Sequence, residues 1–166
     1  RAIAQTKALI ESGLTGQLYA GSLETHWNRG ADYYAAEWRG TWAGEQGGAV
    51  LCHAIHIHDL LSDLCGPVER VYAETATRVN NIETEDCAAL SIKLKNGAVI
   101  TSSITLGAAY DTSRIRLLFE NVTIESGRAP YAPGQFDWTF LARDPDFQPQ
   151  IDKCLDAVEE EVEGYA

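Results

Sequence analysis

Three of the four histidines in the chain fall within one short segment, Cys-His-Ala-Ile-His-Ile-His-Asp, which runs from Cys52 to Asp59. An imidazole titrates near neutral pH, so a histidine can take a proton from a substrate hydroxyl or return it. Cys, His and Asp are also ligand types that zinc accepts. The segment therefore suggests acid–base catalysis, a metal site, or histidines that are hydrogen-bonded parts of a core.

The spacing of these residues favours His56 as the catalytic candidate. The apolar pattern of residues 49–64 predicts one largely buried helix, entered through Gly-Gly and ended by Gly66-Pro67. Residues three or four apart share a helix face, which places four polar side chains on one stripe: Cys52, His56, Asp59 and Asp63. An unpaired polar group in a buried helix costs about 1–3 kcal/mol, so we expect the stripe to line a pocket.

The core interpretation and the metal interpretation concern different residues of the segment. We expect His53 and His58, which lie off the stripe, to be hydrogen-bonded core residues. A zinc site on Cys52, His56 and Asp59 would lack both the His-Glu-x-x-His pattern and a clear further ligand. We therefore predict no metal.

Aromatic and basic residues beside this segment could complete a substrate site. Residues 28–47 mix Gly, Asp, Glu and aromatic residues without a clear period, which predicts a long ordered loop. Aromatic faces stack on sugar rings, and arginine binds hydroxyl or phosphate groups. The alternative for the tryptophans is packing in the core or in a lid. Besides Cys52 and Asp59, the expected substrate-binding residues are Trp27, Arg29, Arg39 and Trp42.

The pattern of the whole chain predicts an α+β fold, with an open, predominantly antiparallel sheet of about six strands and helices packed on one face. Apolar periodicity predicts further helices at 1–13 and at about 149–163. Alternating residues predict strands, at 18–27, 68–79, 88–95, 98–106, 114–119, 122–125 and 136–141.

The sequence does not determine the register of one predicted hairpin. Asn96-Gly97 favours a two-residue turn between the strands at 88–95 and 98–106. Lys95 would then pair with Ala98, and neither sheet face would be uniformly polar. Either a bulge shifts the register, or both faces are covered, one by helices and the other by a second subunit. We favour the second explanation.

Composition limits the classes of partner. The chain has 166 residues, enough for one domain, and a formal net charge of −11. Such acidity disfavours nucleic acid and anionic membranes as partners. No apolar run is long enough to span a bilayer, and no signal peptide is evident. We expect a cytoplasmic protein. Because the chain starts at Arg1 and has no methionine, we expect residues 1–166 to be an excised domain.

Several short motifs also occur in a recognisable order over roughly residues 1–107. They are Leu9 to Gly13 with Gly16, Trp38-Arg39-Gly40-Thr41-Trp42, Gly47-Gly48 leading to His56 and Asp59-Leu60-Leu61, Gly66-Pro67, Ile82 to Asp86, and Asn96-Gly97-Ala98. In order and spacing they resemble the C-terminal domain of the glucose–fructose oxidoreductase / inositol dehydrogenase / MocA-like (Gfo/Idh/MocA) family.

The resemblance implies a two-domain oxidoreductase. An absent N-terminal Rossmann domain would bind NAD or NADP, and this domain would bind a sugar, cyclitol or related polyol. It would also form a homo-oligomer through the open face of its sheet. The fragment itself contains no Gly-x-Gly-x-x-Gly, so we expect it to bind no cofactor and to be inactive alone.

The resemblance also assigns roles on the central helix. The family pattern Asp-x-x-x-His acts with a lysine of the missing domain, and His56 matches the histidine as general acid/base. Cys52 stands where the aspartate is expected. A thiol can replace a charged carboxylate only if its pKa is strongly lowered. Two alternative functions therefore stay open: a non-catalytic binding or regulatory member of the same fold, and a metal-binding domain.

Overall fold

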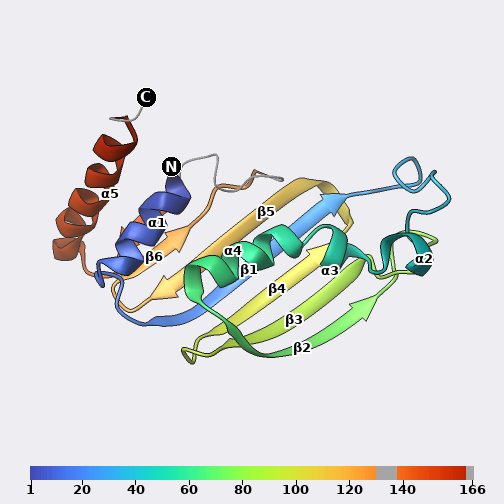
Figure 1. The fold of residues 1–166 in the computed structure, drawn as a ribbon, viewed down its shortest axis with the longest axis horizontal. Coiled ribbons are helices and arrows are strands. Elements are labelled where there is room, and N and C mark those ends of the chain that lie inside the picture. The colour runs from blue at the N-terminus through green and yellow to red at the C-terminus, as the bar shows by residue number, and fades with distance from the viewer. Residues whose placement is uncertain (130–137, 164–166) are drawn as a thin grey trace.

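The computed structural model describes residues 1–129 and 138–163, which form seven strands and several helices (Figure 1). The strands are β1 (Leu18–Asn28), β2 (Val68–Ala76), β3 (Cys87–Leu94), β4 (Val99–Thr105), β5 (Gly107–Phe119), β6 (Val122–Glu125) and β7 (Thr139–Ala142). The helices are α1 (Ala2–Glu11), α2 (Trp42–Glu45), α3 (Ala49–Cys52), α4 (Ile55–Cys65), the short 3-10 helix η2 (Pro145–Phe147) and α5 (Gln148–Glu163).

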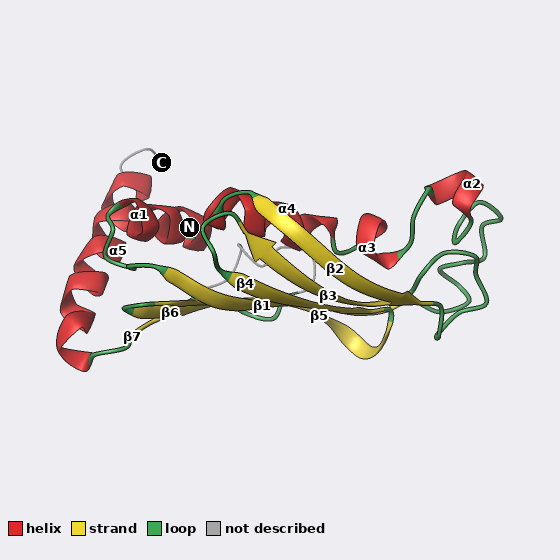
Figure 2. Ribbon diagram, turned by 90° about the horizontal axis from the view of Figure 1, so that it is seen from below, coloured by secondary structure: helices red, strands yellow, loops and turns green. Residues whose placement is uncertain are grey.

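All seven strands belong to one sheet, in the order β2-β3-β4-β1-β5-β6-β7. Only the β1–β4 pair is parallel; every other neighbouring pair is antiparallel. Helices α1, α3 and α4 lie over one face, and no helix of the described residues lies over the other face (Figure 2). The predicted α+β fold is confirmed, with seven strands in place of about six.

The core lies between the central strands and the covering helices. On β1 every second residue faces the helices, and Leu23 pairs with Ile115 of β5 and Ser102 of β4. Leu9 of α1 and Leu61 of α4 complete this layer and are almost wholly buried. Burial of such side chains contributes about 1.5–3 kcal/mol each, which fixes the helices over the middle of the sheet.

The predicted two-residue turn of the hairpin was wrong, whereas coverage of the second sheet face by another subunit stays a prediction. Leu94 faces Ala98, because the turn contains three residues and ends in Gly97, whose φ is +95°. A glycine adopts this backbone conformation without strain. The shift places Ile92 opposite Ile100 on the buried face. Ile92 and Leu94 of β3 and Ile100 and Ile104 of β4 therefore face the helices, while Val99, 55% exposed, faces the open side of the sheet.

The prediction of one continuous helix over residues 49–64 was also wrong. The structure divides it into α3 and α4 at His53, whose backbone has φ −125°. There the Ala49 carbonyl accepts from both His53 N (3.2 Å) and Ala54 N (2.9 Å), which makes a wide turn of the π type. The segment is not largely buried either, since Leu51 and Ile55 are 48% and 44% exposed.

Three predicted strands differ from the structure by more than one residue at an end. Strand β2 ends at Ala76, earlier than predicted, because the buried Asp86 carboxylate accepts the backbone N–H groups that follow, those of Arg78, Val79 and Asn80, at 2.7–2.9 Å. Strand β5 starts seven residues before the predicted Arg114, since pairing with β1 outweighs the weak local pattern there. The prediction at 136–141 begins outside the described residues, and β7 occupies Thr139–Ala142. Within the described residues no helix is long and apolar enough to cross a membrane.

Candidate functional site

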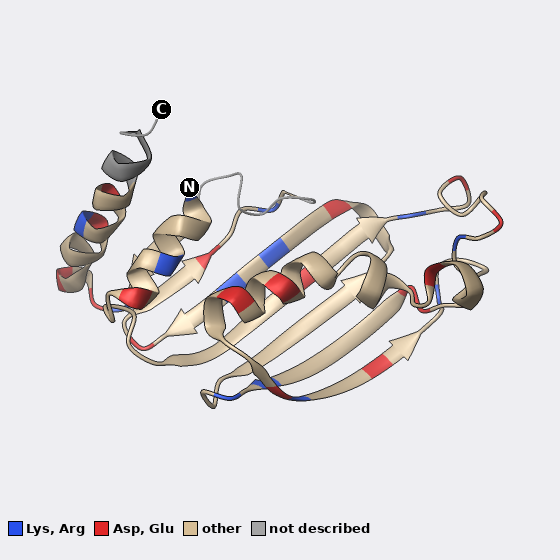
Figure 3. Ribbon diagram, in the orientation of Figure 1, with Lys and Arg blue, Asp and Glu red and all other residues tan. Residues whose placement is uncertain are grey.

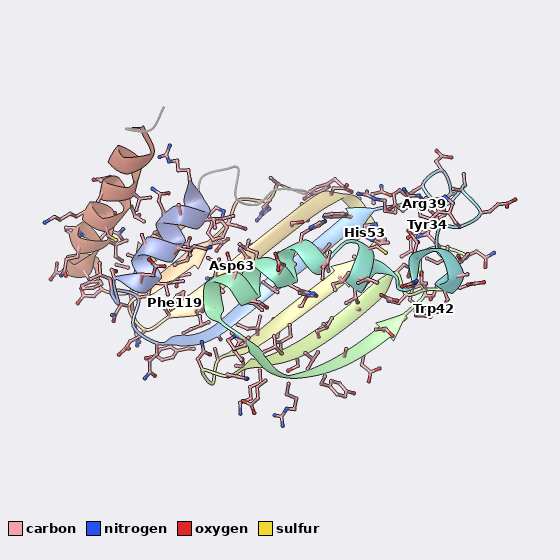
Figure 4. All side chains as sticks on the ribbon, in the orientation of Figure 1. Tyr34, Arg39, Trp42, His53, Asp63 and Phe119 are labelled. Carbon is pink, nitrogen blue, oxygen red and sulfur yellow. The ribbon has the colours of Figure 1, made fainter. Side chains whose placement is uncertain are left out.

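A pocket of about 580 Å³ lies at the end of the sheet where β1 leaves it. The end of β1, the loop that follows and the α3–α4 junction contribute its walls. Figure 4 shows His53, Tyr34 and Arg39 at this end of the molecule, with Asp63 and Phe119 towards the other end. The lining residues are Trp27, Asn28, Arg29, Gly30, Asp32, Tyr33, Cys52, His53 and His56.

The inner wall of this pocket is aromatic. Trp27 is the last buried residue of β1, and its Nε1 donates to Ser113 Oγ of β5 at 3.1 Å. The His53 ring lies against Trp27 and Tyr33, with ring centroids 5.4 and 5.7 Å away. These contacts hold the aromatic side chains in one orientation.

Two arginines extend the aromatic wall. The Arg29 guanidinium lies 5.0 Å from the Trp27 ring and 5.3 Å from that of Tyr33, and it forms an ion pair of 2.9 Å with Asp111. The Arg39 guanidinium lies 4.1 Å from the Tyr33 ring and 4.6 Å from that of Trp38. Cations over aromatic faces are attracted by the ring quadrupole. The loop 28–47 is thereby ordered by stacking of alternating aromatic rings and guanidinium groups.

The structure brings together four of the seven predicted site residues. Trp27, Arg29, Cys52 and His56 all line the pocket. Arg39, Trp42 and Asp59 are not among the described residues that line it. Trp42 begins α2, is 56% exposed, and donates its backbone N–H to Glu83 Oε2 at 2.9 Å.

The expected single polar stripe is interrupted by the helix break. Cys52 ends α3, whereas His56 lies in the first turn of α4, exposed at the pocket. Asp59 is also exposed on α4, and Asp63 forms a surface ion pair with Lys7 at 2.8 Å. The Cys52 thiol lies 3.5 Å from the Gly47 carbonyl as a hydrogen-bond donor. Burial, reinforced by the Glu45 and Glu85 carboxylates, raises the pKa of Cys52, so this thiol is neutral at pH 7.

The two histidines expected in the core have different environments. His58 Nε2 lies 2.9 Å from Ser102 Oγ, which confirms a hydrogen-bonded structural role, and burial lowers its pKa. His53 is 5% exposed, but neither ring nitrogen has a hydrogen-bond partner among the described residues. Burial lowers the pKa of His53 to about 4, and the Arg29 and Arg39 guanidinium groups act in the same direction. His53 is therefore neutral at pH 7.

Sequence reasoning did not assign five lining residues to the site. The only signal for Tyr33 was the aromatic content of its loop, and His53 was assigned to the core because a continuous helix would turn it away from Cys52. The other three have polar or small side chains, which an isolated sequence gives no reason to select. The five are Asn28, Gly30, Asp32, Tyr33 and His53.

The glycines before α3 serve close packing of the chain. A Cβ on Gly44 would lie 2.1 Å from the Trp38 carbonyl oxygen, and one on Gly48 would lie 2.0 Å from that of Glu85. The Glu85 carboxylate also accepts the N–H groups of Gly48 (3.0 Å) and Val50 (3.1 Å). Both glycines therefore allow close approach of neighbouring backbone before α3. In the described part of the chain, no group of three His, Cys, Asp or Glu side chains is arranged to hold a metal ion.

Comparisons identify similar proteins over most of the chain. The family model described as GFO/IDH/MocA C-terminal domain matches residues 3–125, which confirms the resemblance found in the sequence. A comparison with curated proteins gave no match.

Solved structures share the fold. The WlbA dehydrogenase from Bordetella pertussis, in complex with NADH and UDP-GlcNAcA, is 32% identical over 96% of this chain, with a TM-score of 0.76. The Chromobacterium violaceum enzyme with the same ligands is 30% identical over 94%, with the same TM-score. Levoglucosan dehydrogenase, in complex with NADH and levoglucosan, is 20% identical over 85%, with a TM-score of 0.70. The chain spans 47%, 46% and 43% of these three proteins, about half of each.

Proposed function

The chain belongs to the family of GFO/IDH/MocA C-terminal domains, and from this membership we propose that it is the substrate-binding domain of an NAD(P)-dependent dehydrogenase that oxidises a sugar hydroxyl. The observation that supports this most directly is the pocket that joins His56 to the aromatic wall around Trp27. A separate Rossmann domain would hold the cofactor, because this chain contains no Gly-x-Gly-x-x-Gly sequence.

In this proposal His56 is the general acid/base. It takes the proton of the substrate hydroxyl on a ring nitrogen as the alcohol becomes a carbonyl, and returns it in the reverse direction. The bound nicotinamide would accept the hydride from the same carbon. The buried Trp27 supports the aromatic wall from behind, and Tyr33 and the Arg29–Asp111 pair offer the groups that contact the sugar. The side chains of this domain thus position the substrate and move its proton.

Cys52 modifies this scheme. Its pKa is raised, so it supplies no negative charge beside His56. It also lies on α3, across the helix break from His56. In the proposed reaction His56 therefore works without a carboxylate at the position where the family pattern has one. The same observation favours the second candidate function, a non-catalytic binding or regulatory member of the family.

The relatives suggest which sugar to test first. Both WlbA structures contain UDP-GlcNAcA and NADH, and they are 32% and 30% identical to this chain. We therefore propose a sugar nucleotide as the leading substrate class and NADH as the leading cofactor. Other sugars, cyclitols and polyols are further candidates, including levoglucosan, which is bound in a more distant structure.

Our proposal includes a homo-oligomer formed through the open sheet face, in the cytoplasm. This face carries charged side chains of both signs, at positions that alternate with the buried residues of β1, β5 and β6. Figure 3 marks charged positions along the β5 ribbon. Arg114 forms an ion pair with Glu125, and its Nη1 lies 3.9 Å from Glu24 Oε1. Arg116 Nε lies 3.4 Å from Glu125 Oε2. A two-fold interface brings the same surface of both copies together, so the arginines of one copy would face the carboxylates of the other.

The experiment is an assay of the full-length protein that contains this domain. NAD⁺ or NADP⁺ is supplied with UDP-GlcNAcA, levoglucosan, myo-inositol or glucose, and reduced nicotinamide is followed by its absorbance. Turnover with at least one sugar supports the dehydrogenase. Binding of a sugar without turnover supports the non-catalytic candidate, and neither binding nor turnover contradicts both. The 166-residue chain alone should give no turnover.

A further inference from the structure

The ring nitrogens of His53 form no structural hydrogen bond with the described residues. The side chain is 5% exposed, and both ring nitrogens are buried without a hydrogen-bond partner among the described residues. Buried polar groups are nearly always paired, and leaving one unpaired costs stability. His58, five residues further on, shows the ordinary arrangement, with its Nε2 at 2.9 Å from Ser102 Oγ.

The backbone is built to place His53 in the pocket. The wide turn at Ala49 interrupts the helix at this residue, and such turns occur frequently at functional sites. The interruption turns the ring towards the end of β1, against Trp27 and Tyr33. His53 thereby lines the same pocket as His56 and Cys52. Figure 4 shows His53 at the α3–α4 junction, at the same end of the molecule as Arg39 and Tyr34.

We propose that His53 is a substrate-binding residue of this site and that it forms a hydrogen bond with a hydroxyl group of the bound sugar. A neutral imidazole has one N–H donor and one lone pair, and a hydroxyl group can bond to either. The neutral form prevails because burial lowers the pKa of His53, and the Arg29 and Arg39 guanidinium groups lower it further. This role suits binding rather than proton transfer, since a base that resists protonation is a poor proton acceptor. The assignment rests on the proposed function.

The role predicts an unusual pair of effects for one substitution. Replacing His53 by leucine removes an unpaired polar group from the apo protein, so Tm should rise by a few degrees. The same change removes a bond to the substrate, so KM should rise by about 10-fold with a smaller effect on kcat. A purely structural histidine would behave in the opposite way, with a lower Tm and an unchanged KM.

The test compares His53→Leu with His58→Leu in the full-length protein. Thermal unfolding is measured without ligand, and kinetics are measured with NAD⁺ and UDP-GlcNAcA, or with whichever sugar of the same panel the wild type oxidises. His58→Leu should lower Tm, because it leaves Ser102 Oγ without its partner, and should keep the wild-type KM. His53→Gln is the second variant: its amide keeps a donor and an acceptor, so KM should stay closer to that of the wild type.

The outcomes separate the two proposals. An active wild type whose His53→Leu and His53→Gln variants both keep the wild-type KM overturns the assignment of His53 and leaves the dehydrogenase standing. A lower Tm in His53→Leu with unchanged KM identifies His53 as structural and also overturns it. A wild type that oxidises none of the sugars overturns the proposed function, and the His53 assignment with it.

Discussion

The indole of Trp27 and the imidazole of His53 meet edge to face, with ring centroids 5.4 Å apart and ring planes at 81°. Trp27 ends the buried part of the central strand, and His53 lies at the break between α3 and α4. This contact joins the sheet to the helices at the pocket. It also buries a histidine that has no hydrogen-bond partner among the described residues, and that combination has consequences for stability.

Acidification should weaken the fold through His53. Its pKa falls from 6.5 to about 4 on folding, because of burial and the two nearby guanidinium groups. Between these values the unfolded chain binds a proton that the folded chain does not, so the free energy of unfolding falls as pH falls. From about pH 7 to about pH 5, His53 should account for a loss of about 1–2 kcal/mol. His58, whose pKa burial also lowers, adds to the loss.

Urea unfolding of the chain and of its His53→Leu variant at both pH values measures this effect. The wild type should lose more stability on acidification than the variant does. Equal losses in the two proteins would show that His53 does not stay neutral when it folds.

Restoring the family carboxylate at Cys52 should harm the domain. Burial and the Glu45 and Glu85 carboxylates raise the thiol pKa, and the same surroundings oppose a charged aspartate. We expect Cys52→Asp to lower the free energy of unfolding by about 1–2 kcal/mol near pH 7, with a smaller loss near pH 5. Cys52→Ser is the matched neutral control and should stay close to the wild type. A Cys52→Asp variant as stable as Cys52→Ser at pH 7 would argue against this electrostatic account.

Gly48 should not tolerate a side chain. A Cβ there would lie 2.0 Å from the Glu85 carbonyl oxygen, a backbone atom that cannot move without disturbing the start of α3. Gly48→Ala should therefore cost about 2–3 kcal/mol. Gly30→Ala is the control, because a Cβ at Gly30 meets nothing within 4 Å. Denaturant midpoints compare the two, and equal midpoints would mean that the contact with Glu85 relaxes freely.

The sequence predicted the strands from side-chain alternation but not the geometry of two connections. Asn96-Gly97 marked the turn correctly, yet three-residue and two-residue loops share that signal, and the difference reverses every side chain on one strand. No glycine or proline near His53 indicates the helix break in the sequence. It depends on the Ala49 carbonyl accepting two N–H groups, which apolar periodicity cannot reveal.

Site residues could be predicted where several reactive side chains lie close together in the sequence. They could not be predicted where the site forms from segments far apart in the sequence. His56 and Cys52 stood out by type, and Trp27 and Arg29 by their place beside the long loop. The neighbourhood of Trp27 and His53 comes from the parallel pairing of β1 with β4, since that pairing sets β1 under the helices. Such long-range pairing leaves no local trace in the sequence.

His56 is the residue on which the proposed chemistry depends. Because it is exposed, its removal should leave the fold intact. Loss of a general acid/base lowers the rate by about 10²–10⁴-fold. Asp63→Asn changes an exposed residue of the same helix, paired only with Lys7 among the described contacts, and serves as the control.

The most direct measurement is therefore kcat for the full-length protein, for His56→Ala and for Asp63→Asn, with NAD⁺ and the best sugar substrate at saturating concentrations. We predict a kcat about 10²–10⁴-fold lower in His56→Ala, with an unchanged Tm, and a kcat equal to that of the wild type in Asp63→Asn. A His56→Ala variant that oxidises the sugar at the wild-type rate would contradict the account.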